Sequence, residues 1–378
     1  MRHGKTIVLV TAALVTLLCV AAPAFAATLT PVEELGKALF FDENLSLNRD
    51  QSCATCHAPE VGWTGPTAAI NAHGAVYEGS DPGMFGDRKP PTSAYGGDSP
   101  VLHYDEVAGL WIGGMFWDGR ATGWTLGDPL AEQAQGPFLN SREQALASSD
   151  DVIAAVKLST YAGLFEQVWG PDSLDADVAY DYVGLSIAAY EASSEVNPFS
   201  SKYDAWVAGK AKLTRPEMQG FRLFMNKGKC GNCHVPPLFT DFTYDNLGIP
   251  KNLENPVYTW NSIYWVDPGL GGFLKSMAEP ESVWAAEMGK HKVPTLRNVD
   301  LRPSPDFVKA YGHNGYFKSL RDIVHFYNTR DVAVWDPPEY AATVNTTEMG
   351  NLRLTAVQEK AIVTFMKTLS DGYLPQGR

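Results

Sequence analysis

Hydrophobic residues recur at three- and four-residue intervals in only part of the chain. In the first half this spacing predicts helices over Ser141–Val156, Tyr161–Trp169 and Asp175–Glu191. The stretch before them, up to about Asp98, is rich in Gly, Pro, Asp and Asn and shows little helical period. We therefore expect long loops in this stretch, and such loops need a rigid object to pack on.

The second half of the chain begins at Asn197-Pro198, where the helical pattern breaks and where we place a domain boundary. Thr214 and Glu217 form the S/T-x-x-E capping box of a helix that continues through Phe224. The region 236–318 is again rich in loops. The pattern then predicts two further helices, Ser319–Thr329 and one that is capped at Thr355 and reaches about Leu369.

The first 26 residues have the form of a secretory signal peptide. The basic residues Arg2 and Lys5 precede an apolar run from Ile7 to Ala22, and a small-x-small sequence ends at Ala26. No later stretch approaches the roughly 20 apolar residues that a membrane span needs. We therefore expect cleavage after residue 26 and export to the periplasm of a protein that does not span the membrane.

The composition gives a formal net charge of -13 at pH 7. The signal peptide carries Arg2, Lys5 and no acid, so its removal lowers this value by two, to -15. Such an acidic protein is not expected to bind nucleic acid, but it could attract a basic protein partner. A mature length of about 350 residues favours two packed units over one.

The four cysteines that remain after cleavage lie in two short clusters. Both clusters have the C-x-x-C-H pattern of covalent haem attachment: Cys53, Cys56 and His57 in one, and Cys230, Cys233 and His234 in the other. Two thiols at this spacing can add to both vinyl groups of one porphyrin, and the adjoining His reaches the iron. The alternatives are a redox dithiol or a zinc site built from both pairs. The adjoining His and the export signal favour two covalently bound c-type haems, with His57 and His234 as proximal iron ligands.

The layout of the chain repeats itself. Each half contains a cysteine pair with its His, a long loop and helices. We therefore predict a mainly α fold of two cytochrome c-like haem domains with long loops. Residues 27–196 would form the N-terminal domain and residues 197–378 the C-terminal domain.

Three further motifs follow in order along the chain: Phe-Trp-Asp-Gly-Arg at 116–120, the segment from Gln133 to Glu143, and Val-Pro-Thr-Leu-Arg-Asn at 293–298 followed by His-Asn-Gly at 313–315. Together with the haem motifs, this ordered set resembles the bacterial di-haem cytochrome c peroxidases and their relative MauG. The resemblance covers nearly the whole mature chain. It implies a haem that reacts with hydrogen peroxide in the N-terminal domain, an electron-transfer haem in the C-terminal domain, and a tryptophan between them.

The resemblance assigns roles to residues around the first haem. It implies that Trp117 is the bridging indole, although one Trp among ten can also be core packing. It implies that Glu143 is the distal acid, which takes a proton from peroxide and returns it to the departing oxygen. Asn140 and Glu143 could instead be the Ncap and N3 residues of the following helix, and the two roles can coexist. Gln133 and Pro137 match the same catalytic pocket.

His73 lies sixteen residues beyond His57, where some peroxidases of this family carry a distal His that must leave the iron before peroxide can bind. His73 is therefore a possible distal ligand, and the alternative is a loop residue that faces solvent. If it binds the iron, the enzyme needs a reductive activation step.

The sixth ligand of the second haem separates the branches of this family. Conventional peroxidases have a Met fourteen residues after the His of the His-x-Gly motif, and this chain has Tyr327 there. Tyr327 shares a predicted helix face with Leu320, Ile323 and Val324, whereas His325 falls off that face. A buried core Tyr is the alternative. An anionic phenolate stabilises oxidised iron, whereas a thioether favours the reduced state and raises the potential.

MauG carries Tyr at the matching position, and the methanobactin-linked enzyme MbnH is another relative of this kind. Such enzymes hold both oxidising equivalents of peroxide across the two haems and use them on a partner protein. The resemblance therefore favours an oxidase that acts on Trp or Tyr residues of a secreted partner. The alternatives are a conventional peroxidase that receives electrons from a small cytochrome c or cupredoxin, and a non-enzymatic di-haem electron carrier.

Two positions depart from the family pattern. The family's calcium ion between the haems uses an Asn just before the Pro-Thr of the N-terminal loop, and this chain has Lys89 there. A bound calcium is therefore in doubt, because the Lys could supply the positive charge itself. MauG also has a Trp two residues before its second haem motif, where this chain has Gly228. We therefore expect the substrate or its docking route to differ from that of MauG.

Overall fold

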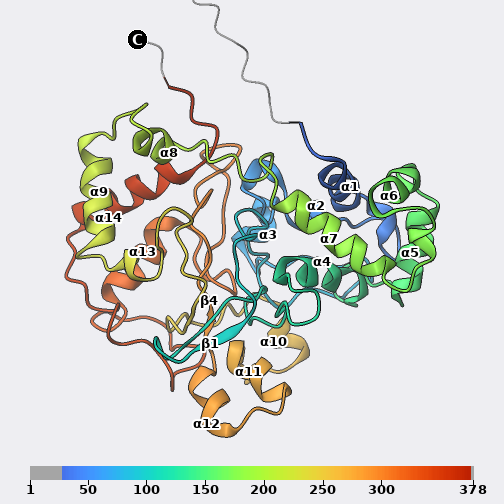
Figure 1. The fold of residues 1–378 in the computed structure, drawn as a ribbon. Helices are drawn as coiled ribbons and strands as arrows, with labels where there is room; N and C mark the ends of the chain where they lie inside the picture. The colour runs from blue at the N-terminus through green and yellow to red at the C-terminus, as the bar shows by residue number, and fades with distance from the viewer. Residues whose placement is uncertain (1–27, 376–378) are drawn as a thin grey trace, which may run out of the picture.

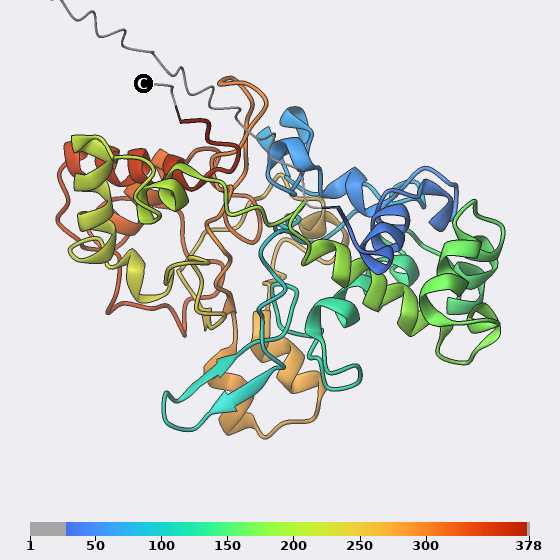
Figure 2. The same cartoon turned by 45° about the horizontal axis from the view of Figure 1, so that its top comes forward.

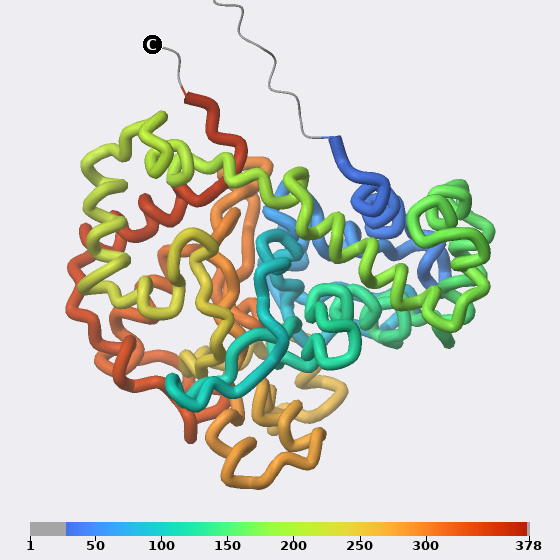
Figure 3. The backbone as a smooth tube through the Cα atoms, in the orientation of Figure 1, coloured from blue at the N-terminus to red at the C-terminus, as the bar shows by residue number. Residues whose placement is uncertain are grey.

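The computed structural model describes residues 28–375 and shows a mainly helical protein with four short strands in that range. The predicted signal peptide, residues 1–26, lies outside the described residues. None of the described helices is both long and apolar enough to cross a membrane. Figures 1 and 3 show helices gathered on two sides of the molecule, with loops running between them. The predicted mainly α fold with long loops is therefore confirmed.

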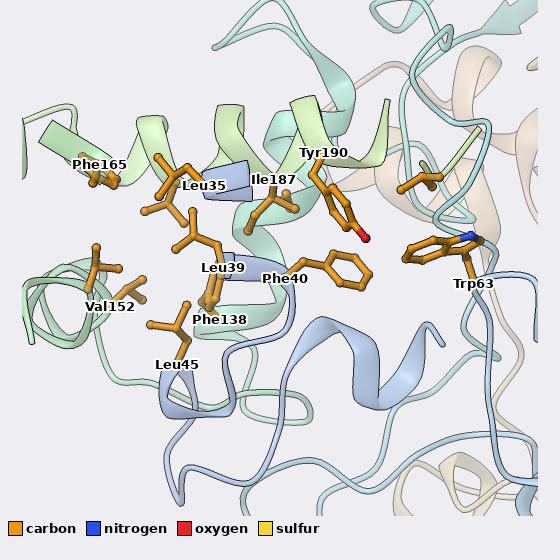
Figure 4. Packing of buried hydrophobic residues seen from close by; sticks show 14 of the residues in the cluster. Leu35, Leu39, Phe40, Leu45, Trp63, Phe138, Val152, Phe165, Ile187 and Tyr190 are labelled. Carbon is orange, nitrogen blue, oxygen red and sulfur yellow. The ribbon is translucent and has the colours of Figure 1, made fainter. Parts of the chain in front are cut away.

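The first lobe contains the helices of the first half of the chain, on the blue and green side of Figure 1. Helices α1 and α4 both pack on α7. Figure 4 shows their apolar side chains meeting in one buried cluster, in which Leu39 and Phe40 of α1 face Ile187 and Tyr190 of α7. The helices of this lobe are α1 (Pro31–Phe40), α2 (Cys53–Cys56), α3 (Ala68–Ala72), α4 (Pro129–Leu139), α5 (Ser149–Lys157), α6 (Ala162–Trp169) and α7 (Ala179–Glu191).

The second lobe lies on the opposite side of Figure 1 and is built on the pair α9 and α14, which pack together. Its buried cluster includes Phe224 of α9, Phe326 of the neighbouring helix α13 and Phe365 of α14. The helices of this lobe are α8 (Lys202–Val207), α9 (Arg215–Met225), α13 (Leu320–Thr329) and α14 (Ala356–Met366).

Short elements form a third group, which Figure 2 shows as a β-hairpin beside the α10–α12 segment. The hairpin pairs β1 (His103–Asp105) with β2 (Leu110–Ile112), in the register His103 to Ile112. A second antiparallel pair joins Tyr244 to Lys292. The remaining elements are β3 (Tyr244–Asp245), β4 (His291–Lys292), α10 (Val257–Trp260), α11 (Gly269–Ser276), α12 (Glu281–Trp284) and the 3-10 turns Glu43–Leu45, Pro59–Val61, Ser173–Asp175, Cys230–Asn232, Ala285–Glu287 and Lys367–Leu369.

The two lobes repeat one helix crossing. In α1 the backbone of α7 approaches so closely that a Cβ on Gly36 would overlap the carbonyl oxygen of Ser186. In α9 a Cβ on Gly220 would overlap the carbonyl oxygen of Ala361 in the same way. Both glycines lie six residues after a Thr that closes a capping box, Thr30 and Thr214. The crossing requires glycine at both positions because no larger residue fits.

Several predicted helix limits are wrong, and the reasons are local. The first stretch is not all loop, because α1 begins at the capping box of Thr30 and Glu33 with Pro31 in its first turn, a signal that the composition of this stretch obscured. The helix expected from residue 141 begins only at Ser149, since residues 141–148 form turns. Helices α4 and α8 were not predicted. The capping box at Thr214 and the helices from 320 and 356 are confirmed.

A buried ion pair network joins the lobes. Arg88 donates to Asp118 of the first lobe through Nη1 (2.6 Å) and to both carboxylate oxygens of Asp267 through Nε and Nη2 (2.6 and 2.7 Å). All three side chains are almost fully buried. Bidentate guanidinium–carboxylate contacts hold both partners in fixed orientations. The loops that follow the two cysteine clusters are therefore fixed relative to each other.

Candidate functional site

Two cavities lie in the two lobes, and each is lined by one C-x-x-C-H motif. The first contains Cys53, Cys56 and His57 and has about 1170 Å³ of unfilled space, its open mouth included. The second contains Cys230, Cys233 and His234 and has about 1410 Å³. Each cavity therefore has room for a large cofactor beside its own motif.

This arrangement excludes one of the alternatives for the cysteines. All four thiols are free, and the two pairs line different cavities. A zinc site needs its four ligands at bonding distance from a single ion. A site built from both pairs is therefore not possible in this fold.

The two histidines are oriented in the same way. Nδ1 of His57 donates to the carbonyl oxygen of Trp63 (3.2 Å), and Nδ1 of His234 donates to that of Phe239 (2.9 Å). Burial lowers the pKa of His57 to about 4 and also lowers that of His234, so both rings are neutral. A neutral imidazole held through Nδ1 keeps the Nε2 lone pair for a metal. The thiols, the ring orientation and the cavity together fit a c-type haem in each lobe.

Glu143 lies in the wall of the first cavity together with Gln133 and Pro137. Helix α4 carries Gln133 and Pro137 and ends at Leu139, and the chain then turns back so that Gln144 N donates to Pro137 O (3.1 Å). Ser80 N donates to Glu143 O (2.6 Å) from a second loop. The family resemblance placed Gln133, Pro137 and Glu143 in one pocket. The structure also places these three residues in the wall of one cavity.

The alternative role of Glu143 as a helix-capping carboxylate is wrong. Asn140 is the C-cap of α4, and the next helix has Ser148 as its N-cap. Burial raises the pKa of Glu143 to about 6, although the nearby Arg120 opposes this rise. A carboxyl group with such a pKa can both take up and release a proton near neutral pH. Glu143 is therefore available for proton transfer in this cavity.

Several polar residues of the first cavity were not found from the sequence. Arg120 and Arg142 line it, and their guanidinium groups stack on the rings of Phe116 and Trp260. Glu191, at the end of α7, is 2% exposed, and burial raises its pKa to about 8. Gln144 is buried as well, and its amide atoms have no hydrogen-bond partner within the described residues. The sequence signal that could have identified Glu191 as a buried residue is its place as an acid on the otherwise apolar face of α7.

Trp117 lies between the cavities and lines both of them. It stands in a tight turn closed by the pairing of Met115 with Ala121, in which Gly119 has a φ of +78°, a conformation that favours glycine. Its indole Nε1 donates to Lys89 O (2.8 Å), and its own carbonyl oxygen accepts from Lys292 N of the second lobe (2.8 Å). This position fits a bridge between two cofactors.

His73 does not lie in the first cavity. It ends the short helix α3, its side chain is 72% exposed, and its Nδ1 pairs with a carboxylate oxygen of Glu254 (2.8 Å). The backbone carbonyl of His73 accepts hydrogen bonds from Asn252 and Lys318 of the second lobe, which hold the loop away from the cavity. In this structure the possible distal ligand His73 is therefore a loop residue that faces solvent.

Tyr327 lines the second cavity, as does Ile323 one turn earlier on α13. Leu320 and Val324, on the same face, are buried, whereas His325 points away and pairs with Glu359 (3.0 Å). The predicted helix face is therefore confirmed. Burial raises the pKa of Tyr327, so its phenolate forms only beside a positive charge.

Met349 is a second candidate ligand in the same cavity, and no motif spacing pointed to it. It lies outside the helix that carries Tyr327, yet Gly350 N donates to Tyr327 O (2.7 Å) and holds the two segments together. Met349 is 8% exposed and lines the second cavity. The cavity thus offers a phenol and a thioether.

Comparison with known proteins agrees with this architecture. Residues 31–212 match the family model described as di-haem cytochrome c peroxidase. The chain is 35% identical to the methylamine utilization protein MauG of Paracoccus denitrificans, over 89% of this chain and 88% of that protein. It is 30% identical to the cytochrome c551 peroxidase of Nitrosomonas europaea, over 77% of this chain and 71% of that protein.

Solved structures agree as well. The diheme peroxidase BthA from Burkholderia thailandensis superposes with a TM-score of 0.79 at 31% identity, covering 91% of this chain and 87% of that chain. A MauG-like protein associated with microbial copper homeostasis superposes with a TM-score of 0.65 at 22% identity, covering 91% of each chain. The second likeness concerns the fold alone.

Proposed function

Since this chain belongs to the di-haem cytochrome c peroxidase family, we propose that it is a periplasmic enzyme that consumes hydrogen peroxide and oxidises Trp or Tyr residues of a secreted partner protein. Two cytochrome c-like domains would each hold one haem, attached through Cys53 and Cys56 in the first lobe and through Cys230 and Cys233 in the second.

The observation that carries the proposal is the position of Tyr327 in the wall of the second cavity. A phenolate ligand stabilises oxidised iron and lowers the reduction potential. A second haem of low potential can be oxidised further, so it can store an oxidising equivalent for a partner. The neutral, oriented His234 would be the other protein ligand of this haem.

The first cavity contains the groups that peroxide cleavage needs. A haem bound there would supply the iron at which the O–O bond breaks. Glu143 takes a proton from the peroxide and delivers it to the departing oxygen, which its pKa of about 6 allows. Arg120 and Arg142 add positive charge to the same wall and favour the developing negative charge on oxygen.

The electrons come from the partner. One hydrogen peroxide takes up two electrons and two protons and gives two water molecules. Two electrons therefore leave the Trp or Tyr residues of the partner, which also release protons. Trp117, in contact with both cavities, is the route by which the oxidising equivalents are shared between the lobes. At the position of MauG's Trp this chain has Gly228, which cannot pass electrons, so the exit to the partner differs.

Met349 favours a second candidate function. If its thioether binds the second iron, that haem has a high potential and acts as an entry point for electrons. The protein would then be a conventional peroxidase, which reduces peroxide to water with electrons from a small cytochrome c or cupredoxin.

Spectra of three variants decide between these functions. In the oxidised parent we expect a phenolate-to-iron charge-transfer band and phenolate modes in the resonance Raman spectrum. Tyr327→Phe should lose both, and Met349→Leu should keep both. Tyr311→Phe is the matched control, because Tyr311 lines the same cavity and is also buried.

Peroxide titration then tests the activity itself. The oxidised parent should react without prior reduction, and Tyr327→Phe should no longer oxidise a protein substrate although peroxide still reaches the first cavity. A parent that reacts only after one-electron reduction, or that loses its second-haem spectrum in Met349→Leu, would establish the conventional peroxidase instead.

A further inference from the structure

Lys89 lies where the two cavities meet. It lines both of them and is only 8% exposed. Its backbone N–H donates to His313 O of the second lobe (2.8 Å), and its backbone carbonyl accepts the indole N–H of Trp117 (2.8 Å). A group bound in either cavity therefore lies near this side chain.

The ammonium of Lys89 contacts neutral oxygens only. Nζ donates to Thr64 Oγ1 (2.8 Å) and to Pro90 O (2.8 Å), and Thr64 Oγ1 in turn donates to Pro90 O (2.6 Å). Desolvation alone shifts the pKa of Lys89, which falls to about 7, and no acidic group opposes that fall. The positive charge is therefore buried without a carboxylate partner in the described chain.

A calcium ion does not fit at this place. Calcium takes six to eight oxygen ligands, which are carboxylates, amide or backbone carbonyls and waters. Here the ammonium already occupies the hydroxyl of Thr64 and the carbonyl of Pro90. A second buried lysine, Lys309, lies close enough for the charge of Lys89 to lower its pKa, and it too donates to carbonyl oxygens, those of Asn298 (2.7 Å) and Leu301 (3.0 Å). A divalent cation would meet two ammonium groups, and the oxygens around it are already hydrogen-bonded to them.

The nearest group of metal-binding side chains does not offer an alternative. Asp267, His291 and His313 lie together close to Lys89, but Arg88 already holds both carboxylate oxygens of Asp267. The two imidazole rings are stacked 3.7 Å apart with an angle of 10° between their planes. With both oxygens of Asp267 bound by Arg88 and the two rings stacked on each other, this group has no free carboxylate ligand.

We propose that the ammonium of Lys89 is the positive charge at the junction of the two haem sites, so that this enzyme needs no calcium ion between its haems. The backbone of Lys89 also positions Trp117, because its carbonyl accepts the indole N–H. The inference does not depend on whether Tyr327 or Met349 binds the second iron.

Haem propionates would compensate the buried charge of Lys89. An unpaired ammonium in a protein interior is unfavourable because it loses its water shell. Each haem carries two propionate carboxylates, and both cavities expose Lys89 to their occupants. These carboxylates would stabilise the ammonium and raise its pKa again. Lys89 thus supplies within the chain the charge that a metal ion supplies elsewhere in the family.

Metal analysis of the purified holoenzyme tests the proposal without any variant. After dialysis against metal-free buffer, we expect two iron ions per chain and calcium far below one per chain. Treatment with the calcium chelator EGTA should leave the melting temperature and both haem spectra unchanged. One calcium ion per chain, whose removal by EGTA changes either property, would overturn the proposal.

Redox titration of charge variants provides the second test. Lys89→Met keeps the side-chain volume but removes the charge, so the oxidised and more positive irons become more stable and both haem reduction potentials should fall. Lys89→Arg keeps the charge and should stay near the parent. Lys309→Met is the matched control: Lys309 lines only the second cavity, so only the second potential should fall.

Unchanged potentials in a folded Lys89→Met variant would contradict the proposal. The result is independent of the proposed function, because neither metal content nor reduction potential depends on which protein donates electrons. A protein with no calcium but no peroxide reaction would refute the enzymatic proposal and leave the role of Lys89 intact.

Discussion

The two lobes position their C-x-x-C-H motifs in the same way, but different side chains line the opposite wall of each cavity. In each lobe two helices cross at a glycine, Gly36 or Gly220, and the motif His donates Nδ1 to a backbone carbonyl a few residues ahead. The wall of the first cavity presents Glu143, the acid that we propose for proton transfer. The wall of the second presents Tyr327 and Met349.

This comparison separates cofactor binding from reactivity. The repeated helix crossing and the oriented His depend on close backbone packing, which leaves little freedom for substitution. The opposite walls come from different parts of the chain: the turn after α4 in the first lobe, and α13 with the loop before α14 in the second. The same helix crossing and oriented His can therefore serve two kinds of haem chemistry, because the residues that decide the chemistry lie in the opposite walls.

We expect the largest effect when one of the two proposed haem attachment sites is removed. The parent should retain two haems after acid–acetone extraction. Replacement of Cys53 and Cys56 by Ala should leave one covalent haem, in the second lobe, since each cavity contains a single motif. The mirror variant of Cys230 and Cys233 is the matched control. Mass spectrometry of the intact protein counts the haems, and a parent with one haem or none would refute the two-site interpretation.

Glu143→Gln removes the carboxylate that we propose for proton transfer from the wall of the first cavity. We expect the rate of peroxide consumption to fall by about 10²–10⁴-fold, the usual contribution of a general acid–base group. Because burial raises the pKa of Glu143 to about 6, the proton-accepting carboxylate is the minor form below that pH and the major form above it. The parent rate should therefore rise with pH through about 6.

The Gln variant should lose this rise in its pH profile. Glu60→Gln serves as the control, because Glu60 is an exposed acid of the same lobe that lines neither cavity. A Glu143→Gln variant with the parental rate and pH profile would show that the proton transfer belongs to another group, such as Glu191.

The shared frame can be tested by adding one methyl group to each lobe. Gly36→Ala and Gly220→Ala should each lower the free energy of unfolding by about 1–3 kcal/mol, because the methyl group overlaps the backbone of the crossing helix. Gly163→Ala in α6 is the control, since a Cβ there meets no atom, and it should be neutral or stabilising. Denaturant titration measures all three. A large effect in only one lobe would mean that the two crossings are not equivalent.

We expect the smallest effect from substitution of Trp117, which lies between the lobes. Trp117→Phe should leave both haems bound and the first step with peroxide unchanged, but it should slow the appearance of oxidation at the second haem, because the larger indole and its hydrogen bond to Lys89 O are lost. Stopped-flow spectroscopy follows the two haems separately. Trp124→Phe is a suitable control, since its indole also donates to a backbone carbonyl, that of Leu102, but it lines neither cavity. Parental kinetics in Trp117→Phe would make Trp117 a packing residue.

Local signals in the sequence determined a large share of the site. The C-x-x-C-H spacing, the capping box at Thr214 and the helix face of Tyr327 all depend on residues within two helical turns of each other. Hydrogen bonds and side-chain directions at that range follow from backbone geometry alone. The same kind of signal at Thr30 predicts α1, and only the loop-like composition around it led to the wrong expectation.

The tertiary structure alone decided what faces each motif. Glu143 enters the first cavity because its turn is held by Pro137 and Ser80, while the loop of His73 is drawn away by Asn252 and Lys318. Met349 reaches the second cavity, and Lys89 reaches both, through contacts between segments that are far apart in the sequence. Such contacts depend on how the two lobes pack, and no local period or spacing encodes that packing. The sequence therefore determined where the two C-x-x-C-H motifs lie, and the packing of the lobes determined which side chains face them.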